Sequence, residues 1–304
     1  MSEERIDVLL STYNGEAFLG QQLDSILTQS DVELSLTVRD DGSTDRTREL
    51  LRHYAARDPR VRIFAASNIG SAASFLALLE LADPMARYFA FADQDDVWVP
   101  DKLRRAVALL RLRPGSQPLL YCSGLQYVDR NLRPLGVSRT PDHVGFPWAL
   151  VENAAAGSTI VMNGRLRELL IERPPRVLRV HDWWCYLVAS ALGEVIYDPA
   201  VTVRYRQHGS NLLGASPHYL GVLVHRIRKY ARGRWTFRPR ELAAELLASF
   251  GPRLTPERTR ILQRLVDSQA SVRSRLTYAL APDVQRSRLL DETLFRLLIL
   301  AGRI

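Results

Sequence analysis

The chain is 304 residues long, with 46% hydrophobic and 24% charged residues. This composition allows a full hydrophobic core and excludes a disordered protein. The two cysteines, Cys122 and Cys185, have no C-x-x-C partner, so neither a disulfide framework nor a thiolate metal site is expected. No apolar run approaches the ~20 residues of a membrane-spanning helix. We therefore expect a cytoplasmic protein that is not integral to a membrane.

The net charge of +8 is unevenly distributed along the chain. Residues 216–304 carry 17 Arg and Lys against 7 Asp and Glu, whereas residues 1–215 carry 24 against 26. The basic character therefore belongs to the C-terminal part. No nucleic-acid reading module accompanies it, so nucleic-acid binding ranks last among the explanations.

The hydrophobic pattern of the first half alternates between strands and helices. Strands are predicted at residues 6–10, 34–38, 61–64 and 88–92, and helices at residues 18–27, 43–54 and 71–82. Ser43 and Thr44 are the N-cap candidates of the second helix. This alternation predicts an α/β fold with a mainly parallel, Rossmann-like sheet flanked by helices.

After Pro100 the pattern predicts a helix, strands at 119–122 and 158–162, a helix that begins at His181, and strands at 195–197 and 201–205. Beyond Gly214 the sequence is helical and rich in arginine. We therefore predict an α/β domain over residues 1–215 and a basic, mainly helical extension over residues 216–304.

Three of the predicted strands end in polar loops, which should meet because ligands bind at the carboxyl ends of parallel strands. The loops are Ser11-Thr12-Tyr13-Asn14-Gly15-Glu16, Asp40-Asp41-Gly42-Ser43-Thr44-Asp45 and Asp93-Gln94-Asp95-Asp96. The first lacks GxGxxG and the second lacks the Walker pattern, so phosphate must be held in another way. Acids bind a diphosphate only through a divalent cation, which predicts Mg²⁺ or Mn²⁺. Taken singly, each loop is also compatible with an ordinary turn or helix cap.

Together, these loops resemble glycosyltransferase family 2 in their order and spacing, and the resemblance covers about the first 215 residues. It implies a GT-A fold, a nucleoside diphosphate sugar donor and inversion at the anomeric carbon. It also implies that Asp95 ligates the metal. The donor-binding residues that it implies are Ser11, Thr12, Tyr13, Asn14, Asp41, Asn68, Gly70 and Asp93.

Inverting transfer needs a base for the acceptor hydroxyl, and the resemblance places Asp182 in that role. Asp182 also suits a purely structural role, because an acid in the first turn of a helix is stabilised by the macrodipole. His181 stands where the family more commonly carries Glu, a variant similar to bacterial rhamnosyltransferases. The neighbouring tryptophans, Trp183 and Trp184, are expected to form either an acceptor platform or part of the core.

A second stretch similar to that branch runs from Val203 to Asn211. Within it, Arg206 is expected to neutralise phosphate charge, and His208 to complete the metal shell or contact the diphosphate. The resemblance implies transfer of L-rhamnose from dTDP-rhamnose to a bacterial surface polysaccharide or lipid-linked glycan. The residues alone leave open a metal-dependent phosphoryl-transfer enzyme, with Asp93 and Asp95 as nucleophile and acid, and a non-catalytic nucleotide-sugar binding module.

The basic C-terminal region has two interpretations. Five basic residues, from Arg226 to Arg234, surround Trp235 and Phe237, and an apolar stretch at 294–299 has Arg296 and Arg303 beside it. Such a region fits peripheral contact with an anionic membrane. The sequence slightly favours the other interpretation, which is ordinary amphipathic helices packed on the domain or on a second subunit, and the oligomeric state is open.

Overall fold

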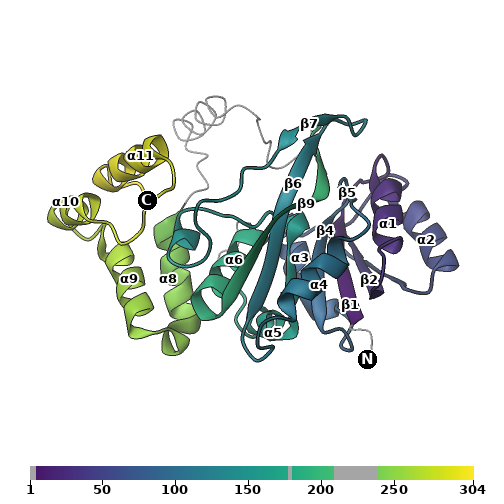
Figure 1. Ribbon diagram of the computed structural model, residues 1–304, viewed down its shortest axis with the longest axis horizontal. Helices are drawn as coiled ribbons and strands as arrows, with labels where there is room; N and C mark the ends of the chain where they lie inside the picture. Colours follow the sequence, from purple (N-terminus) through teal and green to yellow (C-terminus); the bar gives the residue numbers. More distant parts are fainter. Residues whose placement is uncertain (1–4, 177–179, 209–237) are drawn as a thin grey trace.

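The computed structural model describes residues 5–176, 180–208 and 238–304 (Figure 1). Within these residues, one mixed sheet of nine strands has the order β3-β2-β1-β4-β8-β6-β9-β5, and β7 pairs with β6. The strands are β1 (Arg5–Thr12), β2 (Glu33–Asp40), β3 (Val61–Ala65), β4 (Tyr88–Asp93), β5 (Val97–Trp98), β6 (Leu119–Val128), β7 (Pro134–Val137), β8 (Val161–Asn163) and β9 (Glu194–Arg206).

The first four strands are parallel neighbours, which confirms the predicted Rossmann-like half. The second half is mixed, because β8 runs antiparallel to both β4 and β6 while β6 and β9 are parallel. The α-helices are α1 (Leu19–Leu27), α2 (Thr47–Arg57), α3 (Ser71–Leu81), α4 (Lys102–Leu110), α5 (Gly164–Glu172), α6 (His181–Leu192), α8 (Pro239–Phe250), α9 (Pro256–Asp267), α10 (Val272–Leu280) and α11 (Leu289–Leu300).

Successive strand residues pack into two different cores, as the two-residue period of a strand requires. In β4, Phe89 and Phe91 point to the core that contains α3, α5, α6 and the C-terminal helices. Tyr88, Ala90 and Ala92 point to the core that contains α1, α2 and α4. Helices therefore cover both faces of the sheet, as predicted.

Three sequence expectations need correction. The helix expected from Ser43 begins at Thr47, and neither Ser43 nor Thr44 caps it. Residues 158–162 are not one strand, because a 3₁₀ turn, η2 (Gly157–Thr159), precedes the short β8. The two strands expected at 195–205 form one strand, β9, whose pairing with β6 is irregular near Gly124.

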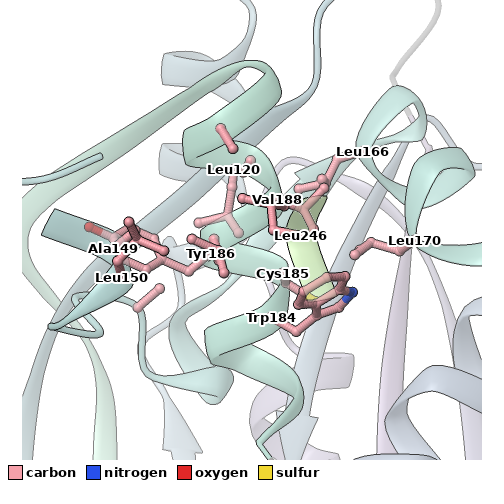
Figure 2. Close-up of a cluster of buried hydrophobic side chains, with 14 of the residues drawn as sticks. Leu120, Ala149, Leu150, Leu166, Leu170, Trp184, Cys185, Tyr186, Val188 and Leu246 are labelled. Carbon is pink, nitrogen blue, oxygen red and sulfur yellow. The ribbon is translucent and has the colours of Figure 1, made fainter. Parts of the chain in front are cut away.

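The C-terminal helices share a core with the sheet domain (Figure 2). Trp184 of α6 is 1% exposed, and its ring centre lies 6.3 Å from that of Phe250 in α8. The predicted boundary at residues 214–217 lies outside the described residues, as does the basic cluster at 226–237, so the two-part division stays a prediction. In the described part of the chain, no helix is long and apolar enough to span a membrane.

Candidate active site

The three polar loops converge at the carboxyl ends of β1, β2 and β4. Ser11 of β1 is paired with Asp93 of β4, and Thr12 is paired with Asp40 of β2. The strand register therefore places all three loops at one edge of the sheet, as the sequence predicts.

Gln94, which the sequence did not single out, ties the first loop to the acidic loop. Its Oε1 accepts hydrogen bonds from Thr12 Oγ1 (2.6 Å) and from the Tyr13 amide (2.9 Å), and its Nε2 donates to Tyr13 O (3.2 Å). A Cβ at Gly15 would overlap Gln94 Oε1 and lie 2.8 Å from Thr12 Oγ1. Gly15 is therefore needed where the two loops approach closely.

Asp41 organises the loop after β3. Its carboxylate pairs with Arg39 and accepts hydrogen bonds from the amides of Ile69 (3.0 Å) and Gly70 (2.9 Å). Gly70 has a φ of 84°, which favours glycine. Asp41 is buried, whereas Asn68, Ile69 and Gly70 are exposed. The donor-binding role of Asp41 thus stays a prediction, and Ile69 is a further exposed residue that could contact the donor.

The first and second loops are also joined through Asn14. Ser43 Oγ accepts from the Asn14 amide (2.9 Å), and Asn14 Oδ1 accepts from the Thr44 amide (2.8 Å). These bonds explain why Ser43 and Thr44 do not cap α2. Ser11 Oγ lies 2.7 Å from Ser74 Oγ. Tyr13, which is 46% exposed, is left as the large exposed side chain of the first loop.

The acidic loop brings Asp95 against His208, although the two residues are 113 positions apart. His208 Nε2 lies 2.7 Å from Asp95 Oδ2, so both predicted metal ligands share one site. A carboxylate and an imidazole are suitable ligands for Mn²⁺, and Mg²⁺ prefers the oxygen. The described residues contain no group of three or more His, Cys, Asp or Glu arranged to hold a metal. The two side chains fit a metal that takes its other ligands from a diphosphate and water.

Carboxylates crowd this site, which makes added positive charge favourable there. Burial, together with the negative charges of Asp95 and Asp182, raises the pKa of Asp93 to about 7. Burial, together with Asp93 and Asp95, also raises the pKa of Asp96. A bound cation would favour the ionised form of these acids.

Lys102 supplies a buried positive charge behind the acidic loop. Its Nζ lies 4.2 Å from the centre of the Trp98 ring, and burial lowers its pKa to about 7 while the charge of Asp96 opposes that shift. Lys102 Nζ and Asp96 Oδ2 each make no hydrogen bond within the described residues. Lys102 therefore offsets the acids only in part.

Arg206 does not present its guanidinium to a phosphate, which corrects the sequence expectation. Its Nε donates to Asp95 O (2.8 Å), Nη2 donates to Gln21 Oε1 (2.6 Å), and Nη1 donates to Arg130 O. The side chain is 1% exposed, and its Cζ lies 4.5 Å from the centre of the Phe18 ring. Arg206 is thus a positioning residue that joins α1, the acidic loop and the end of β9.

Asp182 lies at the start of α6 and is held in a fixed orientation. Its Oδ2 accepts from the Gly157 amide (3.1 Å), and its Oδ1 accepts from Asn153 Nδ2 (3.2 Å). Burial raises its pKa to about 6, although these hydrogen bonds oppose the shift. Its neighbour His181 packs against Phe91 of β4, the strand that leads into the acidic loop, and the charge of Asp182 contributes to the raised pKa of Asp93. The sequence left the direction of this shift open, and burial outweighs the hydrogen bonds that the carboxylate accepts.

His181 is a buried, neutral side chain beside Asp182. Its ring stacks on Phe75 with centres 4.0 Å apart and meets Phe91 edge-on at 5.2 Å. Burial lowers its pKa to about 3. Its Nε2 makes no hydrogen bond within the described residues, and a Cβ at residue 157 would lie 3.1 Å from it. Gly157 therefore leaves room for His181 and also donates its amide to Asp182.

The two tryptophans have different environments. Trp184 lies in the core, which was one of the two expected alternatives (Figure 2). It is therefore too buried to serve as an acceptor platform. Trp183 is half-buried, and its Nε1 donates to Ala149 O (2.7 Å). Of the pair, only Trp183 stays a candidate for acceptor contact.

Comparison with known proteins identifies the class. The model of the family described as "Glycosyl transferase family 2" matches residues 7–116. The dTDP-rhamnosyl transferase RfbG of Shigella flexneri is 30% identical over 221 residues, which cover 68% of this chain and 74% of that protein.

Two groups of solved structures have a similar fold. Residues 1–349 of S. aureus TarS in complex with UDP match with a TM-score of 0.57 at 16% identity, over 96% of this chain and 78% of that chain. The mannosyltransferase PcManGT of Pyrobaculum calidifontis, in complex with GDP-Man and Mn²⁺, matches with a TM-score of 0.54 at 19% identity, over 98% and 80%.

The fold and the site together define a glycosyltransferase with a GT-A fold. More particularly, the chain belongs to glycosyltransferase family 2. This membership favours sugar transfer over the phosphoryl-transfer alternative that the residues alone left open.

Proposed function

We propose that the protein is an inverting glycosyltransferase that transfers L-rhamnose from dTDP-rhamnose to a hydroxyl of a bacterial surface polysaccharide or lipid-linked glycan. The observation that supports this proposal most is the contact of Asp95 with His208, whose Oδ2 and Nε2 atoms are 2.7 Å apart. Asp182 follows His181, which packs on the strand that leads into the same acidic loop. The similarity to a dTDP-rhamnosyl transferase supports the choice of donor.

The chemistry is an in-line displacement at the anomeric carbon. Asp182 accepts the proton of the acceptor hydroxyl while that oxygen forms a bond to the anomeric carbon, and the bond from this carbon to the diphosphate oxygen breaks. The nucleoside diphosphate leaves with the electron pair. A carboxyl with a pKa of about 6 is largely ionised at pH 7 and is still basic enough to act.

Asp95 and His208 would hold a divalent cation, Mg²⁺ or Mn²⁺. When bound, the cation supplies positive charge to the departing diphosphate. Arg206 holds Asp95 in place through the Asp95 carbonyl, and Gln94 holds the acidic loop against Tyr13. The exposed residues Tyr13, Asn14, Asn68 and Gly70 would then contact the nucleotide, and Trp183 the acceptor.

The test is donor binding and donor hydrolysis across a panel of nucleotide sugars, with Mg²⁺, Mn²⁺ or EDTA, on wild type and on Asp95→Ala. Metal-dependent preference for dTDP-rhamnose, lost in the variant, is the expected result. Preference for another donor would overturn the rhamnose assignment while leaving the reaction class intact. Donor binding without turnover, given an acceptor, would indicate a non-catalytic binding module.

A further inference from the structure

The exposed side of the C-terminal helices α10 and α11 is apolar. On α10, Val272, Leu276 and Leu280 recur at four-residue spacing and are between 51% and 80% exposed. On α11, Leu289, Leu290, Leu297 and Leu300 are between 40% and 82% exposed. Residues at these spacings lie along one face of each helix. We name these seven side chains the apolar face.

The opposite sides of the same helices are apolar as well, since they enter the core. Tyr278 and Ala279 of α10 and Phe295, Leu298 and Ile299 of α11 are buried. A surface helix of a globular protein normally turns charged or polar side chains to solvent. Exposed apolar side chains gathered on two neighbouring helices mark a candidate interaction site.

The two helices pack against each other. Arg296 Nη1 donates to the carbonyls of Ala279 (3.0 Å) and Leu280 (3.4 Å), near the end of α10. Gln269, just before α10, donates to Ile299 O (3.3 Å), near the end of α11. Both helices lie at one end of the longest axis of the molecule, opposite α1 and α2 (Figure 1).

The charges around the apolar face are almost entirely positive. Residues 271–304, all of which are described, contain six arginines and three acids. Asp283 pairs with Arg264 (2.8 Å), Glu292 pairs with Arg296 (2.7 Å), and Asp291 is buried. Arg273 and Arg303 are exposed. The acids are thus turned inward, and arginines provide the exposed charge.

We infer that the apolar face, together with its arginines, docks on an anionic lipid surface. Leucines at a bilayer boundary enter the acyl region while neighbouring arginines reach the lipid phosphates. A second copy packed face to face is a poorer partner, because it would bring Arg273 and Arg303 against the same arginines of that copy. Because α8 packs on α6, docking would hold the half that carries Asp182 close to the bilayer.

Vesicle binding can be measured without donor or acceptor, so it is independent of the proposed transfer reaction. The full-length protein is floated with vesicles of phosphatidylcholine alone or mixed with phosphatidylglycerol. Wild type should float with the anionic vesicles and remain unbound with the neutral ones. Leu276→Gln/Leu280→Gln/Leu297→Gln should weaken this binding about a hundredfold. Arg273→Gln/Arg303→Gln should weaken it about fivefold for each arginine.

The matched control is Met85→Gln/Leu112→Gln, which removes two equally exposed apolar side chains outside the C-terminal helices. It should bind vesicles like wild type. Unchanged donor hydrolysis in the leucine variant shows that its catalytic domain is folded and separates this test from that of the proposed function. Absence of wild-type flotation, or equal flotation of wild type and the leucine variant, would overturn the inference. So would a dimer in solution that the leucine substitutions abolish without any vesicle binding.

Discussion

Asp182 combines two properties that a general base needs, a fixed orientation and a raised pKa. Two hydrogen bonds from Gly157 and Asn153 hold the carboxylate, and burial raises its pKa to about 6. Holding a carboxylate in this way costs stability, because the charged form is disfavoured by burial. Carboxyl groups whose pKa is shifted by burial are typical of functional sites.

Replacing Asp182 by Asn should abolish transfer while leaving donor binding intact. The amide has nearly the same shape but cannot accept the acceptor proton, so we expect kcat to fall by about 10²–10⁴-fold. The Kd of the donor, measured by calorimetry, should stay within about threefold, since the interaction removed acts on the acceptor side. A variant that keeps its turnover would show that the base is elsewhere.

The transfer rate should depend on pH through Asp182. The base acts when ionised, so kcat should fall as the pH drops through about 6. The free energy of unfolding should change in the opposite direction to kcat as the pH rises. The folded-state pKa is raised above the unfolded value, so rising pH between about 4 and 6 ionises the unfolded chain first and lowers the free energy of unfolding.

Two measurements check this pH prediction. The first is a pH–rate profile at saturating donor and metal. The fall of kcat below about pH 6 should be present in wild type and absent from the residual activity of Asp182→Asn. Chemical denaturation gives the second: the loss of wild-type stability between about pH 4 and 6 should be smaller in Asp182→Asn, which has no carboxyl to titrate there. The same pH dependence of stability in both proteins would mean that the raised pKa is not realised.

At the scale of elements, the site depends on contacts between loops rather than on single strands. Gln94 joins the end of β4 to the loop after β1, and Arg206 joins the end of β9 to α1 and to the acidic loop. These two side chains hold the loop after β1 and the Asp95–His208 pair in position relative to each other.

Gly15→Ala should displace Gln94 and weaken donor binding by about tenfold, because the new Cβ occupies the position of Gln94 Oε1. Titration calorimetry with the nucleoside diphosphate and Mn²⁺ would measure this. The matched control is Gly20→Ala in α1, where the nearest atom to a new Cβ is 3.7 Å away. This control should bind donor normally and gain about 0.5–1 kcal/mol of stability. Equal donor affinity in both variants would contradict the coupling.

At the scale of the whole molecule, one shared core unites the sheet domain and the C-terminal helices. Trp184 lies at their junction, between α6 and α8. The helices over residues 239–300, which carry the apolar face, therefore share the core that contains α6.

Trp184→Ala should destabilise the protein by about 3–5 kcal/mol, because it leaves a large cavity in this core. Urea denaturation followed by circular dichroism would measure the loss. Trp183→Ala, one residue earlier on the same helix, removes a half-buried ring and should cost less than half as much. Equal losses would show that Trp184 does not carry the junction.

The alternation of strands and helices, the three polar loops and their meeting at one edge of the sheet could be predicted from sequence. Each depends on local periodicity and on the rule that parallel strands carry their ligands at the carboxyl ends. Asp95, His208 and Asp182 were proposed as site residues from the resemblance of short contiguous motifs, and their roles stay predictions. Residues 158–162 and the start of α2 were misassigned, because tertiary hydrogen bonds such as Asn14 to Thr44 overrode local propensity.

By itself, the sequence determined the family, the parallel half of the sheet and the acidic loop at its edge, because short motifs and hydrophobic period are local properties. Only the tertiary structure decided that Arg206 is a buried positioning residue, that Trp184 belongs to the core and that Gln94 couples two loops. It also decided which leucines of α10 and α11 face solvent. The physical reason is the same in each case. Burial and hydrogen-bond partners depend on residues far apart in the chain, such as Arg206 with Gln21 and Asp95, and local pattern carries no information about them.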